Sequence, residues 1–247
     1  MLKVVQGREI WVLPEASHAH EGHEARCRVF YGHAGRPDGM ADLARLLAWA
    51  AAPDGRRIEL AVGPGDNTFH FARFTPDQDG FWAVTVENDV GPVAITKDGF
   101  YRRGTRKDYP DAREVGYYYQ YAKTCVQVGH FCEGCGVVRS PGVACLGHDL
   151  ELVLAPGVFR VGDAALLEVR YRGRPLAGAE VKAAWSLREE EGWALSLTAD
   201  EAGRVRFNLS HPGHWLFYTR HADAALGKAG EYDKRVTSAT LGLFGVR

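Results

Sequence analysis

The sequence predicts an all-β protein built from two β-sandwich domains. Short runs rich in Val, Ile, Phe and Trp recur along the chain, separated by turns that carry Gly, Pro, Asp or Asn. At 247 residues the chain is longer than the usual single domain of about 100–150 residues. The segment FWAVTVEN places Trp82, Val84 and Val86 on one side, which is the alternation of a strand with one buried face.

The first half of the chain carries most of the individual strand signals. Strands are expected at residues 10–13, 26–31, 57–62, 68–74 and 81–87, and again at 150–154. The exception is the segment 40–51, where Leu43, Leu46 and Leu47 recur at helical spacing. Pro53 follows and ends that run. We expect a short helix here, and a tight loop within a β domain is the alternative.

The middle of the chain changes character. Residues 99–147 are rich in charge and Tyr and then in Cys, which predicts a long cysteine-rich insertion. From residue 150 onward, about seven short strands in about 100 residues predict a sandwich. The segments GRPLAGAEV and TADEAGRVRF supply two of its tight turns. We therefore expect an N-terminal β domain at 1–149, which holds the insertion, and a C-terminal β-sandwich domain at 150–247.

The composition excludes several classes of partner. Lys and Arg number 30 against 31 Asp and Glu, so no overall charge favours nucleic acid or an anionic membrane surface. The longest clean apolar stretch, 46–52, is far shorter than the roughly 18 residues that cross a bilayer. We expect no nucleic-acid partner and no direct insertion into a membrane. The first residues read as a strand and not as a signal peptide, so either the protein stays inside the cell or a leader has been removed.

Several motifs along the chain resemble one known family. They are REIWVLPE, YGH, PDG, HDLELVLAP, GRPLAGAEV, TADEAGRVRF, PGHWLFYTRH and SATLGLFGV. Together they are similar to the DUF4198 proteins, which include extracytoplasmic components of nickel and cobalt uptake systems. The resemblance implies immunoglobulin-like or carboxypeptidase-regulatory-like sandwiches, a nickel or cobalt ion, and a membrane transporter component as partner. It also implies a periplasmic or other extracytoplasmic location, with a cytoplasmic one left open.

One position departs from the family's pattern. Members often begin, once a signal peptide has been cleaved, with a His-acidic-aromatic-Trp stretch, and the matching residues here are Arg8, Glu9, Ile10 and Trp11. A guanidinium group stays protonated and has no lone pair to offer a metal ion. We therefore do not expect a metal site built on a terminal histidine in this chain.

Histidines gather early in the chain, in the segment SHAHEGHE. His18 and His20 are two residues apart, so they share one side of an extended segment, and a turn at Gly22 would bring His23 round. His33 ends the strand that follows, and we expect that strand to run back alongside them. Imidazoles in such a set suit nickel, copper and zinc. The alternative is a polar loop whose histidines are solvated.

Four cysteines form a second candidate site. They are Cys125, Cys132, Cys135 and Cys145, with His130 and His148 nearby. One interpretation is two disulfides, such as Cys132–Cys135 or Cys125–Cys145, that hold the insertion in an oxidising compartment. The other interpretation is a metal site of a kind that zinc occupies, in which the CxxC pair supplies two thiolates in one tight turn. Cys27 lies in an expected strand, where it would be a small buried apolar residue.

No catalytic motif accompanies these candidates. The sequence has no GxSxG, HExxH or P-loop, so we expect a binding protein and not an enzyme. The leading hypothesis is an extracytoplasmic accessory protein that binds nickel or cobalt for a metal uptake system, and it depends mainly on the resemblance. The alternative is a structural or adhesion-type β-sandwich module without metal cargo. A thiol redox enzyme working through Cys132 and Cys135 is a third hypothesis.

Overall fold

The computed structural model describes residues 7–129, 140–157, 159–186 and 188–247, and strands dominate them. Sheet A has the order β1 (Glu9–Pro14), β2 (Ala25–His33), β7 (Phe69–Phe74) and β6 (Ala61–Pro64), with β3 (Arg36–Gly39) paired to β2. Sheet C has the order β11 (Leu150–Leu154), β12 (Ala164–Tyr171) and β13 (Arg174–Pro175), with β16 (Arg204–Asn208) paired to β12.

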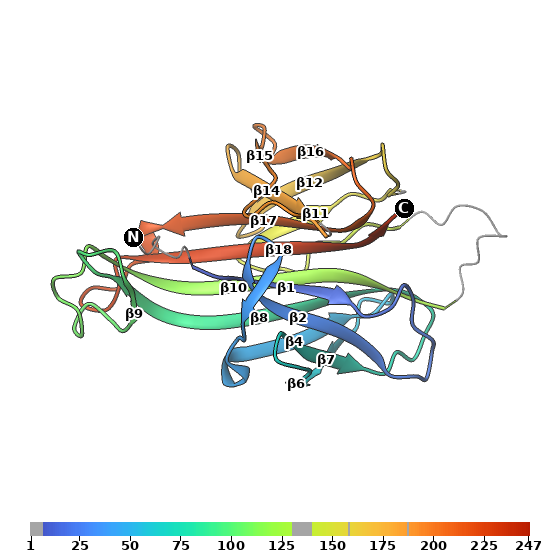
Figure 1. The fold of residues 1–247 in the computed structure, drawn as a ribbon, viewed down its shortest axis with the longest axis horizontal. Helices are drawn as coiled ribbons and strands as arrows, with labels where there is room; N and C mark the ends of the chain where they lie inside the picture. Colours follow the sequence, from blue (N-terminus) through green and yellow to red (C-terminus); the bar gives the residue numbers. More distant parts are fainter. Residues whose placement is uncertain (1–6, 130–139, 158, 187) are drawn as a thin grey trace.

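Sheet B is the nine-stranded sheet of the described chain. Its order is β15 (Leu195–Thr198), β14 (Glu180–Trp185), β17 (Gly213–Asp223), β18 (Lys234–Val246), β10 (Glu114–Val128), β8 (Gly80–Ile95), β4 (Leu46–Ala51) and β5 (Arg57–Glu59), with β9 (Tyr101–Arg103) paired to β8. The long strands β18, β10 and β8 run side by side through the middle of the molecule (Figure 1). The expectation of an all-β sandwich fold is confirmed.

Sheet B carries one smaller sheet on each face, because its side chains alternate between two cores. From β10, Ala122, Val126 and Val128 enter a core shared with sheet A. From the same strand, Tyr121 enters a second core shared with sheet C. Successive strand residues point to opposite faces, so the two cores lie on opposite sides of sheet B.

Each core draws mainly on one half of the chain. The first core contains Trp82 and Val84, which are fully buried as the alternation of FWAVTVEN predicts. The second contains Leu150 and Phe217, and each such side chain stabilises the fold by about 1.5–3 kcal/mol on burial. The parallel pairing of β10 with β18 joins the halves into one sheet. The division into domains at residue 149 stays a prediction.

The expected helix at 40–51 is wrong. A three-residue 3-10 turn, η1 (Leu43–Arg45), leads into strand β4, which pairs with β8 on one side and β5 on the other. Ala48 and Ala50 enter the first core, and Trp49 packs on the opposite face. Leucine and alanine tolerate both helical and strand spacing, so pairing with the neighbouring strands decides the outcome.

The segment 99–147 is only partly irregular. It contains the strand β10, so the tyrosine run lies in the centre of sheet B and not at an edge. Cross-strand hydrogen bonds fix these rings, as where the Tyr117 hydroxyl donates to Asp89. The structure has no helix long and apolar enough to cross a membrane among the residues that it describes.

Candidate functional site

The histidine segment forms a loop between β1 and β2 that is fastened to the end of β10. The amide of Ala19 donates to the carbonyl of Gln127 at 2.8 Å, and the amide of Gly129 donates to the carbonyl of Ala19 at 2.9 Å. These bonds fix the backbone of the histidine loop, residues 17–24, beside the end of β10. The backbone of the loop is therefore fixed to β10 at Ala19, although most of its side chains are exposed.

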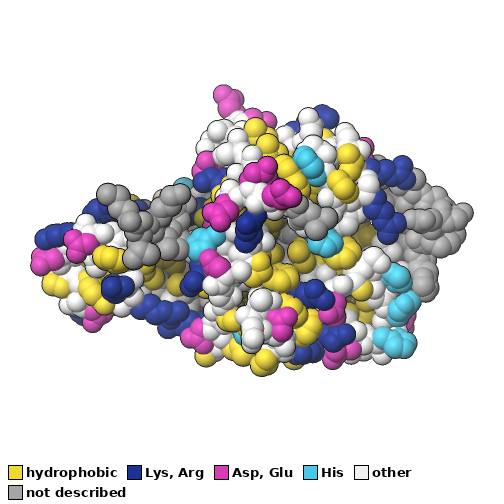
Figure 2. Space-filling view, viewed as in Figure 1, with side chains coloured by type: hydrophobic (Ala, Val, Ile, Leu, Met, Phe, Trp, Pro, Cys, Tyr) yellow, Lys and Arg dark blue, Asp and Glu magenta, His cyan; other side chains and the backbone are white. Residues whose placement is uncertain are grey.

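Three of the expected histidines come together in this loop. The ring centroids of His18 and His20 are 4.9 Å apart, and those of His20 and His23 are 6.1 Å apart. The turn expected at Gly22 is present, with φ at +74°, a conformation that favours glycine. Histidine side chains gather at the right-hand end of the face drawn in Figure 2. Both ring pairs meet edge to face, and no group of three potential ligands is poised around one point in the described part of the chain.

His33 does not join the other three. It ends β2, so the full length of that strand separates it from the histidine loop. Its Nδ1 lies 2.5 Å from the carboxylate of Asp38, which also accepts a bond from Arg8 Nε at 2.7 Å. Partial burial opposes ionisation of Asp38, but these two partners hold its pKa below the usual value. His33 and Arg8 therefore belong to a separate surface ion-pair group.

The cysteines do not form the bridge expected between Cys125 and Cys145, which are both free thiols. Burial raises the pKa of Cys125 to about 12, so this thiol is protonated at neutral pH. Cys27 is fully buried in the first core, as expected. The remaining candidates of this cluster, His130, Cys132 and Cys135, lie outside the described residues.

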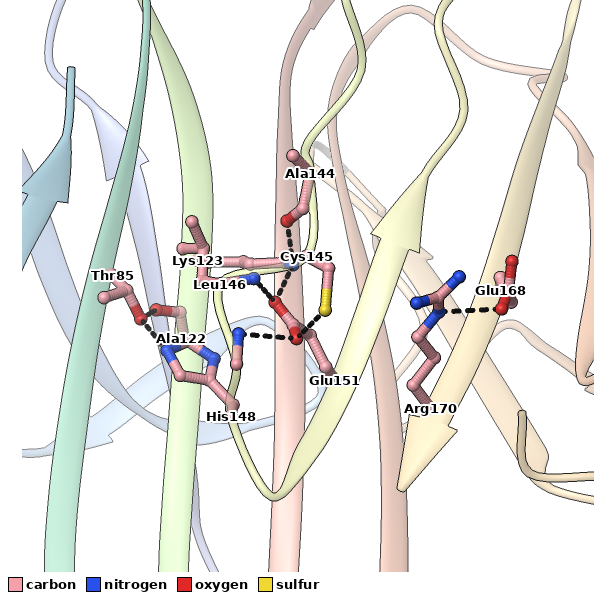
Figure 3. A network of polar contacts seen from close by, with 11 residues as sticks. Thr85, Ala122, Lys123, Ala144, Cys145, Leu146, His148, Glu151, Glu168 and Arg170 are labelled. Atoms are coloured by element: carbon pink, nitrogen blue, oxygen red, sulfur yellow. Dashed lines mark hydrogen bonds and ion pairs between the residues drawn. The ribbon is translucent and has the colours of Figure 1, made fainter. Parts of the chain in front are cut away.

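Cys145, which is exposed, instead contacts a polar network centred on the buried carboxylate of Glu151 (Figure 3). The Glu151 carboxylate accepts bonds from Lys123 Nζ at 2.6 Å and from the Cys145 thiol at 2.9 Å. The amides of Leu146 and Gly147 donate to it as well, at 2.5 and 3.2 Å. Lys123 also donates to the carbonyl of Ala144 at 2.8 Å. The network therefore fastens residues 144–147 to sheet B and to β11.

The ion pair at its centre is withdrawn from water. The side chains of Lys123 and Glu151 are 2% and 1% exposed. Burial opposes the charge of Glu151, but Lys123 and the surrounding donors hold the pKa of this carboxyl below its usual value. Burial and the hydrogen bond to Glu151 raise the pKa of Cys145. A thiol held in its protonated form is a weak nucleophile, so the network positions a loop and does not activate Cys145.

His148 extends the network toward the tyrosines of sheet B. Its ring stacks on Tyr121 with centroids 4.4 Å apart and meets Trp49 edge to face. The Thr85 hydroxyl donates to the carbonyl of Ala122, so its oxygen accepts from His148 Nε2 at 3.3 Å. Burial lowers the pKa of His148 to about 4, and the imidazole is neutral at physiological pH.

Sequence reasoning missed Lys123 and Glu151. Each is a single charge within an apolar strand, in YAKTC and in LELVL. Their position as lone charges could have indicated a buried ion pair, because a charge inside a buried strand needs a partner of opposite charge. The sequence does not say which partner, since the two residues come from strands on either side of the cysteine segment.

Solved structures that resemble this chain are distant. Trypsin-activated α2-macroglobulin from Escherichia coli matches with 12% identity and a TM-score of 0.29, over 95% of this chain and 15% of that one. A DUF4785 family protein from Legionella pneumophila matches with 10% identity and a TM-score of 0.33, over 85% of this chain and 51% of that one. The D0-D1 domain of intimin matches with 10% identity and a TM-score of 0.22, over 94% and 97%.

The sequence comparisons are more specific. No curated protein matches the chain. A sequence profile of the DUF4198 family, described as a domain of unknown function, matches residues 5–223. That span includes the histidine loop, the cysteine segment and the buried network. This chain therefore belongs to the DUF4198 family.

Proposed function

We propose that this protein binds nickel or cobalt through His18, His20 and His23 and passes the ion to a membrane component of a metal uptake system. The observation that carries the proposal is the meeting of these three imidazoles in one loop, with successive ring centroids 4.9 and 6.1 Å apart. Imidazole nitrogen is a good ligand for both ions and for zinc. In this proposal the protein carries the ion and then gives it up, so an exposed site that can release the ion suits this function.

The loop favours capture of a metal without enclosing it. Its backbone is fixed by the bonds of Ala19 to β10, so binding would order side chains and not main chain. The edge-to-face ring pairs would have to rotate until three nitrogens point at one ion. Imidazoles must be neutral to bind, so protons compete with the metal and the ion is released as pH falls.

Isothermal titration of the untagged full chain with nickel and cobalt chloride tests the proposal. We expect the variant His18→Ala/His20→Ala to bind at least about tenfold more weakly than the original protein. His211→Ala is a matched control, because His211 is an exposed histidine that contacts the preceding serine as His18 does. We expect affinity to fall from about pH 7.5 to about pH 5.5.

Unchanged affinity in the double variant would overturn the assignment. Loss of binding only in Cys132→Ser/Cys135→Ser would transfer the ion to the cysteine pair. Either outcome separates the histidine loop from metal binding.

A further inference from the structure

A pocket of about 540 Å³ opens on sheet B where η1 leads into β4. It is lined by Asp42, Ala44, Arg45, Leu46, Leu47, Asp89 and Tyr119. The pocket is shallow and open to solvent, so a ligand would lie across it and stay partly exposed. Tyr119 lies nine residues before Val128 on β10, so at about 3.3 Å per residue the pocket is roughly 30 Å from the histidine loop. It is a separate site.

Hydrogen bonds hold the floor of this pocket in place. The Tyr119 hydroxyl donates to Glu87 at 2.8 Å, and Trp49 Nε1 donates to the other oxygen of the same carboxylate, also at 2.8 Å. The Tyr117 hydroxyl lies 2.8 and 2.9 Å from the two oxygens of Asp89. A ligand would therefore meet a preformed ring and carboxylate, which reduces the ordering cost of binding.

Arg45 is the fixed donor of the pocket. Its Nη1 donates to the carbonyls of Asp89 and Val90 at 2.9 and 3.1 Å, and its Nε lies 3.4 Å from Asp42 Oδ2. Within the described residues, its Nη2 has no protein partner, so two N–H groups remain for a ligand. Gly91 makes room for this arrangement, because a Cβ there would stand 3.2 Å from Nη1.

The chemistry of these groups indicates the class of ligand. The pocket contains hydrogen-bond acceptors, the carboxylates of Asp42 and Asp89, and a donor, the guanidinium of Arg45. A ligand with neighbouring hydroxyl groups can both donate to the carboxylates and accept from the guanidinium. Leu47, 42% exposed, and the half-buried ring of Tyr119 add apolar surface for C–H groups. Two carboxylates disfavour an anion, and the guanidinium disfavours an amine. We propose that this pocket binds a neutral saccharide.

Titration of the full chain with four uncharged oligosaccharides tests this site. The probes are maltohexaose, cellohexaose, xylohexaose and the hexamer of β-1,4-linked N-acetylglucosamine, with spermidine and inorganic phosphate as charged comparisons. We expect one of the four to bind most tightly. Asp42→Asn and Asp89→Asn should each weaken that binding at least about tenfold. We expect both variants to keep the fold, because Asn is as good an N-cap for η1 as Asp, and the side-chain oxygen of Asn at position 89 still accepts from Tyr117.

Asp111→Asn is the matched control, since Asp111 is an exposed aspartate outside the pocket. Its binding should equal that of the original protein. Binding of none of the four saccharides, tighter binding of spermidine or phosphate, or unchanged affinity in both pocket variants would each overturn the proposal. Metal binding by the histidine loop has no part in these outcomes, so the two proposals fail independently.

Discussion

The histidine loop and the Glu151 network both gather polar, ionisable side chains, but the loop is at the surface and the Lys123–Glu151 pair is buried. In the loop, His18, His20 and His23 contact one another at the surface, on a backbone fastened to β10. In the network, Lys123 and Glu151 are buried, and the carboxylate is surrounded by donors. By residue type alone, both regions hold side chains that could bind a proton or a ligand. Burial separates the two regions, because the loop lies at the surface and the Lys123–Glu151 pair does not.

The largest expected difference between the two regions is in stability. Lys123→Met leaves the Glu151 carboxylate buried without its cation, and we expect a loss of about 3–5 kcal/mol in the free energy of unfolding. Urea denaturation at neutral pH measures it. Adding Glu151→Gln should recover part of the loss, because the uncompensated charge is then removed. A loss below about 1 kcal/mol in Lys123→Met would mean that the pair is more hydrated than its burial indicates.

The second expected effect is a pH dependence that originates at His148. Burial lowers its pKa from 6.5 to about 4, so the unfolded chain binds the proton more tightly than the folded protein. Stability is therefore complete above pH 6.5 and is lost as pH falls toward 4, by about 3 kcal/mol from this group. Glu151, Lys123, Glu87 and Arg57 also act on this ring.

The variant His148→Gln isolates that contribution from other titrating groups. The unfolding free energy of the original protein minus that of this variant should fall by about 3 kcal/mol as pH falls from about 6.5 to about 4. A constant difference for His148→Gln across the window would show that the imidazole is not kept neutral by burial.

The smallest expected effect belongs to the histidine loop. His18→Ala/His20→Ala should change the free energy of unfolding by less than about 0.5 kcal/mol, because the side chains lie at the surface and the backbone bonds of Ala19 remain. The urea denaturation used for Lys123→Met measures this as well. A loss above about 2 kcal/mol would give the histidines a structural role like that of the network, and the contrast between the two regions would disappear.

Alternation in the sequence was enough to predict the all-β fold and the buried face of β8. Proximity along the chain was enough to place His18, His20 and His23 in one loop. The direction of β2 away from the loop was not predictable in this way, so His33 was misplaced. Strand β4 was not predictable from the sequence either, because its pairing with β8 and β5 overrides the helical spacing of its leucines. The Lys123–Glu151 pair depends on which strands the fold brings together, and no local pattern records that.

The central position of β18 has a consequence for how the chain reaches this fold. This strand follows the other seventeen in sequence, yet it lies between β10 and β17 in sheet B. Thr124 bonds to Gly242 across 118 residues of chain. Contacts of such long range slow folding, because the entropy of closing the loop is lost before the contact forms. During synthesis β10 therefore has one edge unpaired until β18 has emerged, and an unpaired strand edge is a site at which chains can aggregate.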